Sequence, residues 1–462
     1  MDTRKVHINS FGCQMNKLDS AIVTGALEDA GFTLTEKVKD ADVVLINTCS
    51  VRRHAEDRVL SHLGHLKHIK ETRPRLVVGV IGCMAQRLGA ELLDHEAVDI
   101  VCGPAQIPQI PGLVKRALEE QKKILTVTQN IRRKCSDDQS DALDNFELAY
   151  DSDKNHIPGQ AFVRVMRGCN NFCSYCVVPY VRGPEVSRPP QAIIEQIKKL
   201  AADGVKQITL LGQTINSYSF PAGDRTYRLA DLLEMASEVD GIRWIRFITS
   251  YPVGFDESIL HAMADLPKVC PYLHIPAQSG SDKILKAMNR GYTASEYLDL
   301  LTKARRIVPG IAIAGDFIVG FPSETDADFA ATVQLVKKAK YKNCFIFKYS
   351  PRPGTRADDK LTDTVPDDVK KRRNVELLAV QNQISGEYNK CFLGRTLEVL
   401  VEGPSKKPHL NIAENAGRPQ LIGRTATDYI VVFNGPESLA GELAEVEITK
   451  TSPLTLFGKI RE

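Results

Sequence analysis

RGCNNFCSYC, at residues 167–176, is the stretch that decides the fold of this 462-residue chain. It places Cys169, Cys173 and Cys176 in a C-x3-C-x2-C spacing directly after the strand-like run AFVRVMRG. Three thiolates this close together can surround one metal centre, and cysteine thiolates are the ligands of iron–sulfur clusters. With three protein ligands, a four-iron cluster keeps one iron free for an exchangeable ligand. The triplet therefore predicts a [4Fe-4S] cluster with an open iron.

The alternative interpretation of this triplet is a structural zinc site. Such a site usually takes further ligands from a second Cys or His pair at short range, and no such pair follows Cys176. The chain contains 11 cysteines, an odd number, and its opening MDTRKVHINSFG lacks the apolar core of a signal peptide. We therefore expect a cytoplasmic protein whose cysteines serve metal or redox chemistry rather than disulfides.

Six strand-like runs, each followed by a segment of helical pattern, extend from the triplet toward the C-terminus: AFVRVMRG, QITLLGQ, RWIRFITS, PYLHIPA, IAIAGDFIVG and NCFIFKYS. Six βα units in one run are typical of a (β/α) barrel or part of one. Binding sites of such barrels lie at the C-terminal ends of the strands. This rule selects Gln213, Ser250, Gln278, Gly320 and Arg352, although a polar residue at a strand end could also cap the following helix.

The cysteine spacing, with Tyr175 before the last cysteine, resembles the signature of the radical S-adenosylmethionine superfamily, whose partial barrel agrees with the six βα units. The resemblance implies that S-adenosylmethionine binds the open iron and is cleaved to methionine and a 5'-deoxyadenosyl radical. It also implies cofactor contacts by Tyr175, by Gln213 in LLGQ and by Gly320 in IVGFP, the stretch that passes the adenine. Ser250 and Gln278 are further candidates for contacts with the cofactor.

A second set of cysteines lies in the first 120 residues, where strand-like and helical segments alternate as in parallel βαβ units. Cys13, Cys49 and Cys83 each follow a strand-like run: VHINSFGC, DVVLINTC and RLVVGVIGC. Because parallel strands end at one edge of a sheet, we expect the three thiols to converge there. Free cysteine is also a common core residue, and we expect burial for the remaining ones, Cys102, Cys135, Cys270, Cys344 and Cys391, although Cys102 follows the run VDIV in the same manner and could be a fourth ligand. We expect a solvated helix face, with metal ligation as the alternative, for the histidines after Cys49: His54, His62, His65 and His68.

GCQMNKLDS, INTCSVRRHAEDRV and GCMAQR resemble the methylthiotransferase family, in which these three cysteines bind an auxiliary [4Fe-4S] cluster. That family continues with the radical barrel and a C-terminal TRAM domain. The short alternating runs TLEVLVEG, RTATDYIVVF, GELAEVEITK and LTLFGKI also predict a small β-barrel at the C-terminus. We therefore expect an α/β protein with an auxiliary-cluster domain at 1–120, a linker at 121–157, a partial (β/α)6 barrel at 158–388 and a TRAM domain at 389–462.

The resemblance implies a transferase that uses two S-adenosylmethionine molecules, one to methylate sulfur on the auxiliary cluster and one to supply the radical. Gln14, Met15 and Asn16, together with NTCSVR, are most similar to the branch that adds a methylthio group to C2 of N6-dimethylallyladenosine at tRNA position 37. A base in a single-stranded loop suits such a reaction because it is easily splayed out. Sibling branches modify threonylcarbamoyladenosine in tRNA or an aspartate of a ribosomal protein. A noncatalytic, metal-stabilised RNA-binding protein is the alternative of a different class.

The implied partners are a tRNA anticodon loop and a flavodoxin- or ferredoxin-like electron donor, for a monomer without a membrane segment. Binding of tRNA cannot rest on bulk charge, because the net charge is +3 and residues 392–462 hold 8 Lys or Arg and 9 Asp or Glu. Local basic side chains are the candidates for phosphate contacts, with GRPQLIGRT expected as a loop, although a solvated surface explains them equally well. These candidates are Arg395, Lys406, Lys407, Arg418 and Arg424.

Overall fold

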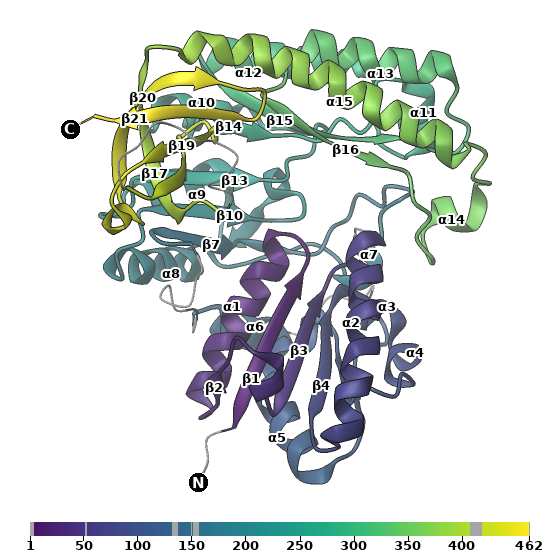
Figure 1. The fold of residues 1–462 in the computed structure, drawn as a ribbon. Coiled ribbons are helices and arrows are strands. Elements are labelled where there is room, and N and C mark those ends of the chain that lie inside the picture. The colour runs from purple at the N-terminus through teal and green to yellow at the C-terminus, as the bar shows by residue number, and fades with distance from the viewer. Residues whose placement is uncertain are drawn as a thin grey trace. The chain divides into compact units, whose positions relative to one another are not determined.

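The computed structural model describes residues 4–50, 53–131, 137–148, 150, 157–406 and 418–461. The chain divides into two compact units, which are described separately (Figure 1). The N-terminal unit comprises residues 1–154, 166–172 and 176–192, and the barrel unit comprises residues 155–165, 173–175 and 193–462.

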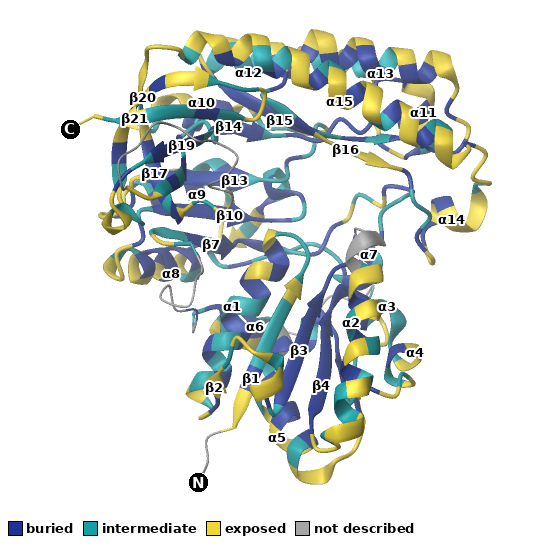
Figure 2. Cartoon of the chain, viewed as in Figure 1, coloured by how far each residue is buried: buried dark blue, intermediate teal, exposed yellow. Residues whose placement is uncertain are grey.

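A six-stranded parallel sheet, of order β2-β1-β3-β4-β5-β6, forms the centre of the N-terminal unit. Its two central strands are buried along their whole length, as in sheets covered by helices on both faces (Figure 2). Alternate residues of β3 belong to different cores, since Val43 packs in one apolar cluster and Val44 in the other. The strands are β1 (Lys5–Phe11), β2 (Thr33–Leu34), β3 (Val43–Thr48), β4 (Val77–Gly82), β5 (Ile100–Cys102) and β6 (Ile124–Thr126).

The helices of this unit follow the strands in the predicted alternation. The main ones are α1 (Gln14–Asp29), α2 (Arg53–Thr72), α3 (Cys83–Leu88), α4 (Ala90–Leu93), α5 (Ile110–Glu120), α6 (Asp137–Leu148) and α7 (Val178–Val181), and a short antiparallel pair joins β8 (Met166–Arg167) to β9 (Val186–Ser187).

The stretch expected as a linker, 121–157, contains ordered structure. Strand β6 pairs with β5 and completes the sheet, and the stretch also contains α6. The Asp144 carboxylate of α6 accepts hydrogen bonds from Arg167 at 2.6 Å and from Arg188 at 3.1 Å. The sequence shows little periodicity here because β6 has three residues and because ion pairs, rather than an apolar stripe alone, hold α6.

All six predicted strands of the central region are present in the barrel unit, and each sheet is parallel. They form two three-stranded sheets that are joined where Cys270 N donates to Ile245 O at 2.9 Å and Ser250 N donates to His274 O at 3.0 Å. The strands are β7 (Gln160–Arg164), β10 (Gln207–Leu211) and β13 (Trp244–Ile248), then β14 (Tyr272–His274), β15 (Ala312–Val319) and β16 (Asn343–Lys348).

Helices follow these strands, and α12, α13 and α15 lie together beside β15 and β16 (Figure 1). The sequence did not indicate the hairpin formed by β11 (Ser219–Ala222) and β12 (Arg225–Arg228). The helices are α8 (Pro190–Ala202), α9 (Leu229–Ser237), α10 (Glu257–Asp265), α11 (Asp282–Ala287), α12 (Ala294–Ile307), α13 (Asp326–Ala339), α14 (Arg356–Lys360) and α15 (Asp367–Asn389). No helix within the described ranges has both the length and the apolarity needed to cross a bilayer.

The C-terminal segment forms a closed five-stranded barrel, as predicted, of order β17-β18-β19-β21-β20. One prediction is wrong: GRPQLIGRT is not a loop throughout, because Gln420–Arg424 forms β18 between its neighbours β17 and β19. Leu421 of this strand is fully buried in the barrel core. The strands are β17 (Thr396–Pro404), β18 (Gln420–Arg424), β19 (Ile430–Asn434), β20 (Leu443–Thr451) and β21 (Thr455–Ile460).

Candidate functional site

Cys13, Cys49 and Cys83 lie at the carboxyl edge of three neighbouring strands, β1, β3 and β4, whose last residues are register partners across the sheet. Cys13 is the N-cap of α1, Cys49 directly follows β3, and Cys83 is the first residue of α3. A side-chain hydrogen bond joins Cys13 to Cys49. The structure therefore places the three cysteines at one edge, as the strand pattern predicts.

A buried pair of asparagine amides fixes the backbone around these thiols. The Cys13 thiol donates to Asn16 Oδ1 at 3.3 Å, and Asn16 Nδ2 donates to Asn47 Oδ1 at 3.0 Å and to Thr48 O at 2.8 Å. Asn47 Nδ2 donates back to Asn16 O at 2.9 Å. Gly82, just before Cys83, has φ of 95°, and a Cβ there would lie 2.6 Å from Asn47 Oδ1. Only glycine fits at this close approach.

Arg182 is a charged group in contact with this edge, and sequence reasoning did not identify it. Its Nε donates to Cys83 Sγ at 3.2 Å, and its Nη2 donates to the Asp19 carboxylate at 3.0 Å. Both side chains are buried, with 7% of Arg182 and 1% of Asp19 exposed. The hydrogen bond with Cys49, aided by the charge of Arg182, lowers the pKa of Cys13 to about 5. Burial raises the pKa of Cys83, and Arg182 opposes that rise.

The second triplet lies in the loop that follows β8. Cys169 and Cys173 are buried and Cys176 is half-buried. Gly168 has φ of 72°, and a Cβ there would lie 1.9 Å from Pro184 O, so the chain enters this loop through a position that requires glycine. The Cys169 amide donates to Gly183 O at 3.1 Å.

A buried arginine also donates to a thiol of this triplet. Arg290 Nη1 lies 3.4 Å from Cys173 Sγ, and its Nη2 donates to Pro276 O at 2.8 Å. Its Nε donates to the Tyr292 hydroxyl at 2.9 Å, and its guanidinium lies 4.5 Å from the Tyr251 ring centroid. Arg290 is only 5% exposed, so these contacts hold it in place. Each triplet thus has one thiol that accepts a hydrogen bond from a buried guanidinium.

The thiols of both triplets have the chemistry of cluster ligands. All six are free of disulfides, and four of them are buried. Within the described ranges, no three His, Cys, Asp or Glu side chains already stand in a metal-binding arrangement. The donor set, three cysteines in each triplet with a buried cation at one thiol, fits an anionic iron–sulfur cluster with an exchangeable fourth position.

Four of the predicted cofactor contacts, Gln213, Ser250, Gln278 and Gly320, follow barrel strands, whereas Tyr175 lies in the loop after β8. The Ser250 hydroxyl is buried and has no hydrogen-bond partner within the described structure, so it is free to bind a ligand. Gln278 is 8% exposed and adopts φ of 72°, and its backbone N–H donates to Asp316 O. Gln213 is half-buried, and Tyr175 packs at the edge of an apolar cluster.

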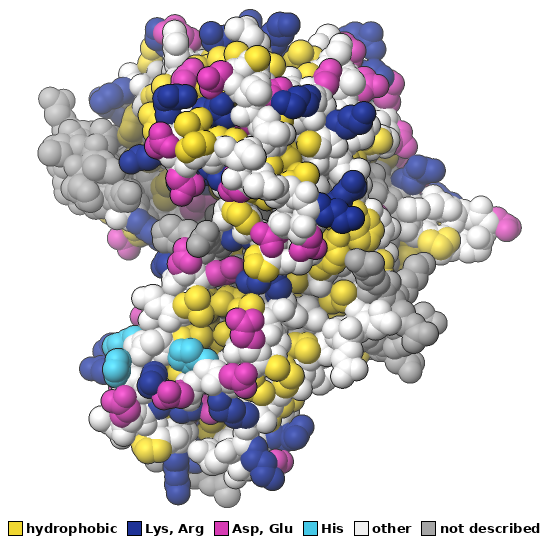
Figure 3. Space-filling view, turned by 90° about the vertical axis from the view of Figure 1, so that its right-hand side faces the viewer, with side chains coloured by type: hydrophobic (Ala, Val, Ile, Leu, Met, Phe, Trp, Pro, Cys, Tyr) yellow, Lys and Arg dark blue, Asp and Glu magenta, His cyan; other side chains and the backbone are white. Residues whose placement is uncertain are grey.

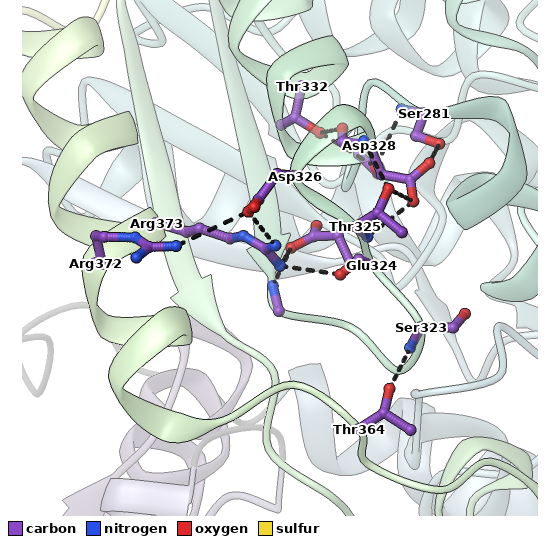
Figure 4. Close-up of polar contacts among 12 residues, drawn as sticks. Ser281, Ser323, Glu324, Thr325, Asp326, Asp328, Thr332, Thr364, Arg372 and Arg373 are labelled. Carbon is purple, nitrogen blue, oxygen red and sulfur yellow. Dashed lines mark hydrogen bonds and ion pairs between the residues drawn. The ribbon is translucent and has the colours of Figure 1, made fainter.

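The loop after β15, which contains Gly320, is held by a buried carboxylate that sequence reasoning missed (Figure 4). Glu324 Oε2 accepts from the Gly320 amide at 2.7 Å and from Arg373 of α15 at 2.8 Å. Arg373 also donates to Asp326 at 2.8 Å. Burial raises the pKa of Glu324, which the Gly320 amide and Arg373 counteract. Glu324 and Arg373 of α15 therefore hold in place the stretch that is predicted to pass the adenine.

The basic candidates of the C-terminal barrel divide into two groups. Arg395, Lys406 and Arg418 are exposed. Arg424 is half-buried and donates to Glu402 and Asp428, each at 2.9 Å, and Lys407 lies outside the described residues. On the face that Figure 3 shows, basic and acidic side chains are interspersed, in agreement with the nearly balanced charge.

The remaining cysteines and histidines mostly behave as expected. Cys102, Cys270 and Cys344 are buried, whereas Cys391 is exposed, so its predicted burial is wrong. Cys391 lies in a short 3-10 turn after α15 that leaves the core. His62 is half-buried and pairs with Asn9 at 3.1 Å. His65 and His68 are exposed. Cys135 and the side chain of His54 lie outside the described residues.

Three family models match the chain in sequence order. They are the uncharacterized protein family UPF0004 at residues 5–103, the Radical SAM superfamily at 163–336 and the TRAM domain at 390–460. Named relatives match over nearly the whole length. A tRNA-2-methylthio-N(6)-dimethylallyladenosine synthase of Rhodopirellula baltica is 42% identical, over 99% of this chain and 96% of its own. Synthases of the same name from Porphyromonas gingivalis W83 and Thermoanaerobacter sp. X514 are 41% and 42% identical, covering 99% of this chain and 95% and 92% of theirs.

Solved structures share the fold at low sequence identity. The radical S-adenosylmethionine methyltransferase TsrM from Kitasatospora setae gives a TM-score of 0.52 at 15% identity, over 77% of both chains. The cobalamin-dependent S-adenosylmethionine radical enzyme OxsB gives 0.51 at 12% identity, over 80% of this chain and 56% of its own. These structures support the architecture of the fold.

Proposed function

We propose a function for this chain from the premise that it belongs to the tRNA-2-methylthio-N(6)-dimethylallyladenosine synthase family, whose members match nearly its whole length. The chain adds a methylthio group to C2 of N6-dimethylallyladenosine at tRNA position 37. The observation that carries this proposal is the placement of Cys13, Cys49 and Cys83 at one sheet edge. Sulfur insertion requires a second three-thiol site in addition to the cysteine triplet of a radical enzyme.

Cys169, Cys173 and Cys176 are the proposed ligands of the first [4Fe-4S] cluster. When bound there, the cluster and S-adenosylmethionine supply a 5'-deoxyadenosyl radical. The protein's part is to hold and orient this reagent. Arg290 orients the Cys173 thiol, and the unpartnered Ser250 hydroxyl offers the cofactor a buried hydrogen-bonding group.

Tyr175, Gln213, Gln278 and Gly320 complete the proposed cofactor contacts. Glu324 supports them indirectly, because it bonds the Gly320 amide and so fixes the loop.

Cys13, Cys49 and Cys83 are the proposed ligands of the second, auxiliary [4Fe-4S] cluster. Asn16 accepts from the Cys13 thiol and donates to Asn47 and to the carbonyl of Thr48, the residue before Cys49. C2 of an adenine carries a hydrogen that no ordinary base removes, so its replacement by a methylthio group requires the radical generated at the other site.

The substrate is a base in the anticodon loop, which is single-stranded and can be unstacked at low cost. The TRAM match supports RNA binding by the C-terminal barrel, with Arg395, Lys406, Lys407 and Arg418 as candidate phosphate contacts. Arg424 is a weaker candidate because two carboxylates hold it. We further propose a monomer that works in the cytoplasm, where tRNA is found, with a flavodoxin- or ferredoxin-like electron donor.

The test uses the anaerobically reconstituted full chain, tRNA that carries dimethylallyladenosine, and mass spectrometry of the digested nucleosides. Wild type should form both 5'-deoxyadenosine and the 2-methylthio nucleoside. Cys173→Ala should abolish both products, whereas Cys49→Ala should still form 5'-deoxyadenosine but no methylthio product. Cys102→Ala, a buried cysteine outside both triplets, should retain both activities. Methylthio product from Cys49→Ala at the wild-type rate would overturn the proposal, and activity only on a ribosomal protein would assign the chain to a sibling branch.

A further inference from the structure

Arg182 links the segment that follows Cys176 to Cys83 within the N-terminal unit. It lies six residues after Cys176 in the chain and is the C-cap of α7, while its guanidinium bonds Cys83 of the other triplet. Val177 and Val181 of the same segment form a buried cluster with Cys83. The segment that leaves the radical triplet is therefore packed directly against an auxiliary-site thiol.

Two oppositely charged side chains of the described residues meet at this contact. Arg182 is a cation that acts on Cys13 and Cys83, and Asp19 is a carboxylate that pairs with it. Because both side chains are buried, water screens their charges only weakly. A cluster bound by three thiolates gains a further negative charge when it is reduced. A buried cation that donates a hydrogen bond to a ligand sulfur favours that reduced state, and a buried carboxylate opposes it.

We propose that Arg182 is a positioning residue of the auxiliary cluster: its hydrogen bond to Cys83 orients that ligand and raises the reduction potential of the cluster. Asp19 sets the size of this effect by partly neutralising the guanidinium. The inference rests on the proposed function, since it assumes that Cys13, Cys49 and Cys83 bind the auxiliary cluster. It adds the residue that controls how readily this cluster accepts an electron.

The test isolates the auxiliary site in the full chain by replacing Cys169, Cys173 and Cys176 with Ala. The readouts are iron and sulfide per chain, the electron paramagnetic resonance spectrum of the reduced cluster, and its midpoint potential from a dye-mediated titration. Arg182→Gln should shift the potential to more negative values and weaken iron retention against a chelator about tenfold or more, as is typical for loss of a partner that orients a metal ligand.

Opposite signs separate this inference from general damage to the fold. Asp19→Asn, which removes the countercharge, should shift the potential to more positive values. Arg182→Lys keeps the charge but not the paired donor geometry, and should lie between wild type and Arg182→Gln. Lys70→Gln is the matched control, because it breaks a partly buried ion pair with Asp99 at the opposite end of the same sheet, and it should leave the potential unchanged.

Each result has a defined meaning. If the triple-alanine protein binds no cluster, the proposed function fails together with the inference. If it binds a cluster, but Arg182→Gln and Asp19→Asn leave the potential and spectrum unchanged or shift the potential in the same direction, only the role of Arg182 is overturned. Should Arg182→Gln retain no cluster at all, Arg182→Lys and Asp19→Asn still decide the sign.

Discussion

The six cysteines proposed as cluster ligands and the groups that surround them differ in how far the sequence reveals them. Cys169, Cys173 and Cys176 are predictable because their spacing is short, and Cys13, Cys49 and Cys83 because each follows a strand-like run. No local sequence pattern indicates the arginines that contact these cysteines. Arg182 is 99 residues from Cys83 and Arg290 is 117 residues from Cys173, so both contacts exist only through the fold.

At the same scale, Gly82 gives a prediction about the backbone behind Cys83. Gly82→Ala places a methyl group 2.6 Å from Asn47 Oδ1 and 2.7 Å from Thr48 O, at a φ of 95° that disfavours any side chain. We expect it to lower the free energy of unfolding of the metal-free chain by about 2–4 kcal/mol. Gly31→Ala is the control, since Gly31 has φ of 90° but no neighbour within 4 Å, and it should cost about 1–2 kcal/mol. Equal losses in urea unfolding would show that the close approach has no effect.

Among the elements, those with a strong period or a repeated βα pattern are predictable, and short or ion-paired ones are not. The six barrel strands match their sequence runs, and Thr325 with Asp328 forms a capping box that starts α13. Strand β18 was missed because QLIGR is short, contains glycine and follows a proline. Helix α6 was missed because its fixed contacts include ion pairs to distant arginines, which no local pattern reveals.

The cap of α13 predicts how stability depends on pH. Burial alone would raise the pKa of Asp328, but hydrogen bonds from Ser281, Thr325 and Lys283 together lower it well below its usual range. A carboxyl whose folded pKa is depressed stabilises the fold above its unfolded pKa, near 4, and loses that contribution as pH falls further. Asp328→Asn should therefore cost about 1–3 kcal/mol at pH 7. In urea unfolding, its difference from wild type should stay constant above about pH 5 and shrink as the pH falls from about 4 toward the folded pKa; a difference that is unchanged down to about pH 3 would contradict the argument.

Across the whole barrel unit, one partly buried carboxylate joins the C-terminal barrel to the (β/α) strands. Asp428 sits in the β18–β19 turn and accepts from Arg246 of β13 at 3.0 Å, from Lys342 before β16 at 2.9 Å and from Arg424 at 2.9 Å. Apolar side chains of both parts share one core around it, including Tyr272 and Val399. Such a joint holds the proposed RNA-binding barrel in a fixed position on the catalytic barrel.

Asp428→Asn should loosen this joint, because it takes the countercharge from the buried cations Arg246 and Lys342, whereas Arg424 keeps its pair with Glu402. Removing one partner of a buried ion pair typically costs about 3–5 kcal/mol. We expect that loss in urea unfolding, together with faster tryptic cleavage between α15 and β17 that releases the C-terminal barrel. Glu442→Gln is the matched control, because Glu442 pairs with Lys206 across the same two parts but is 55% exposed, and it should cost at most about 1 kcal/mol. If both variants resist trypsin like wild type, the apolar core alone fixes the two parts, and the buried charges at Asp428 serve another purpose.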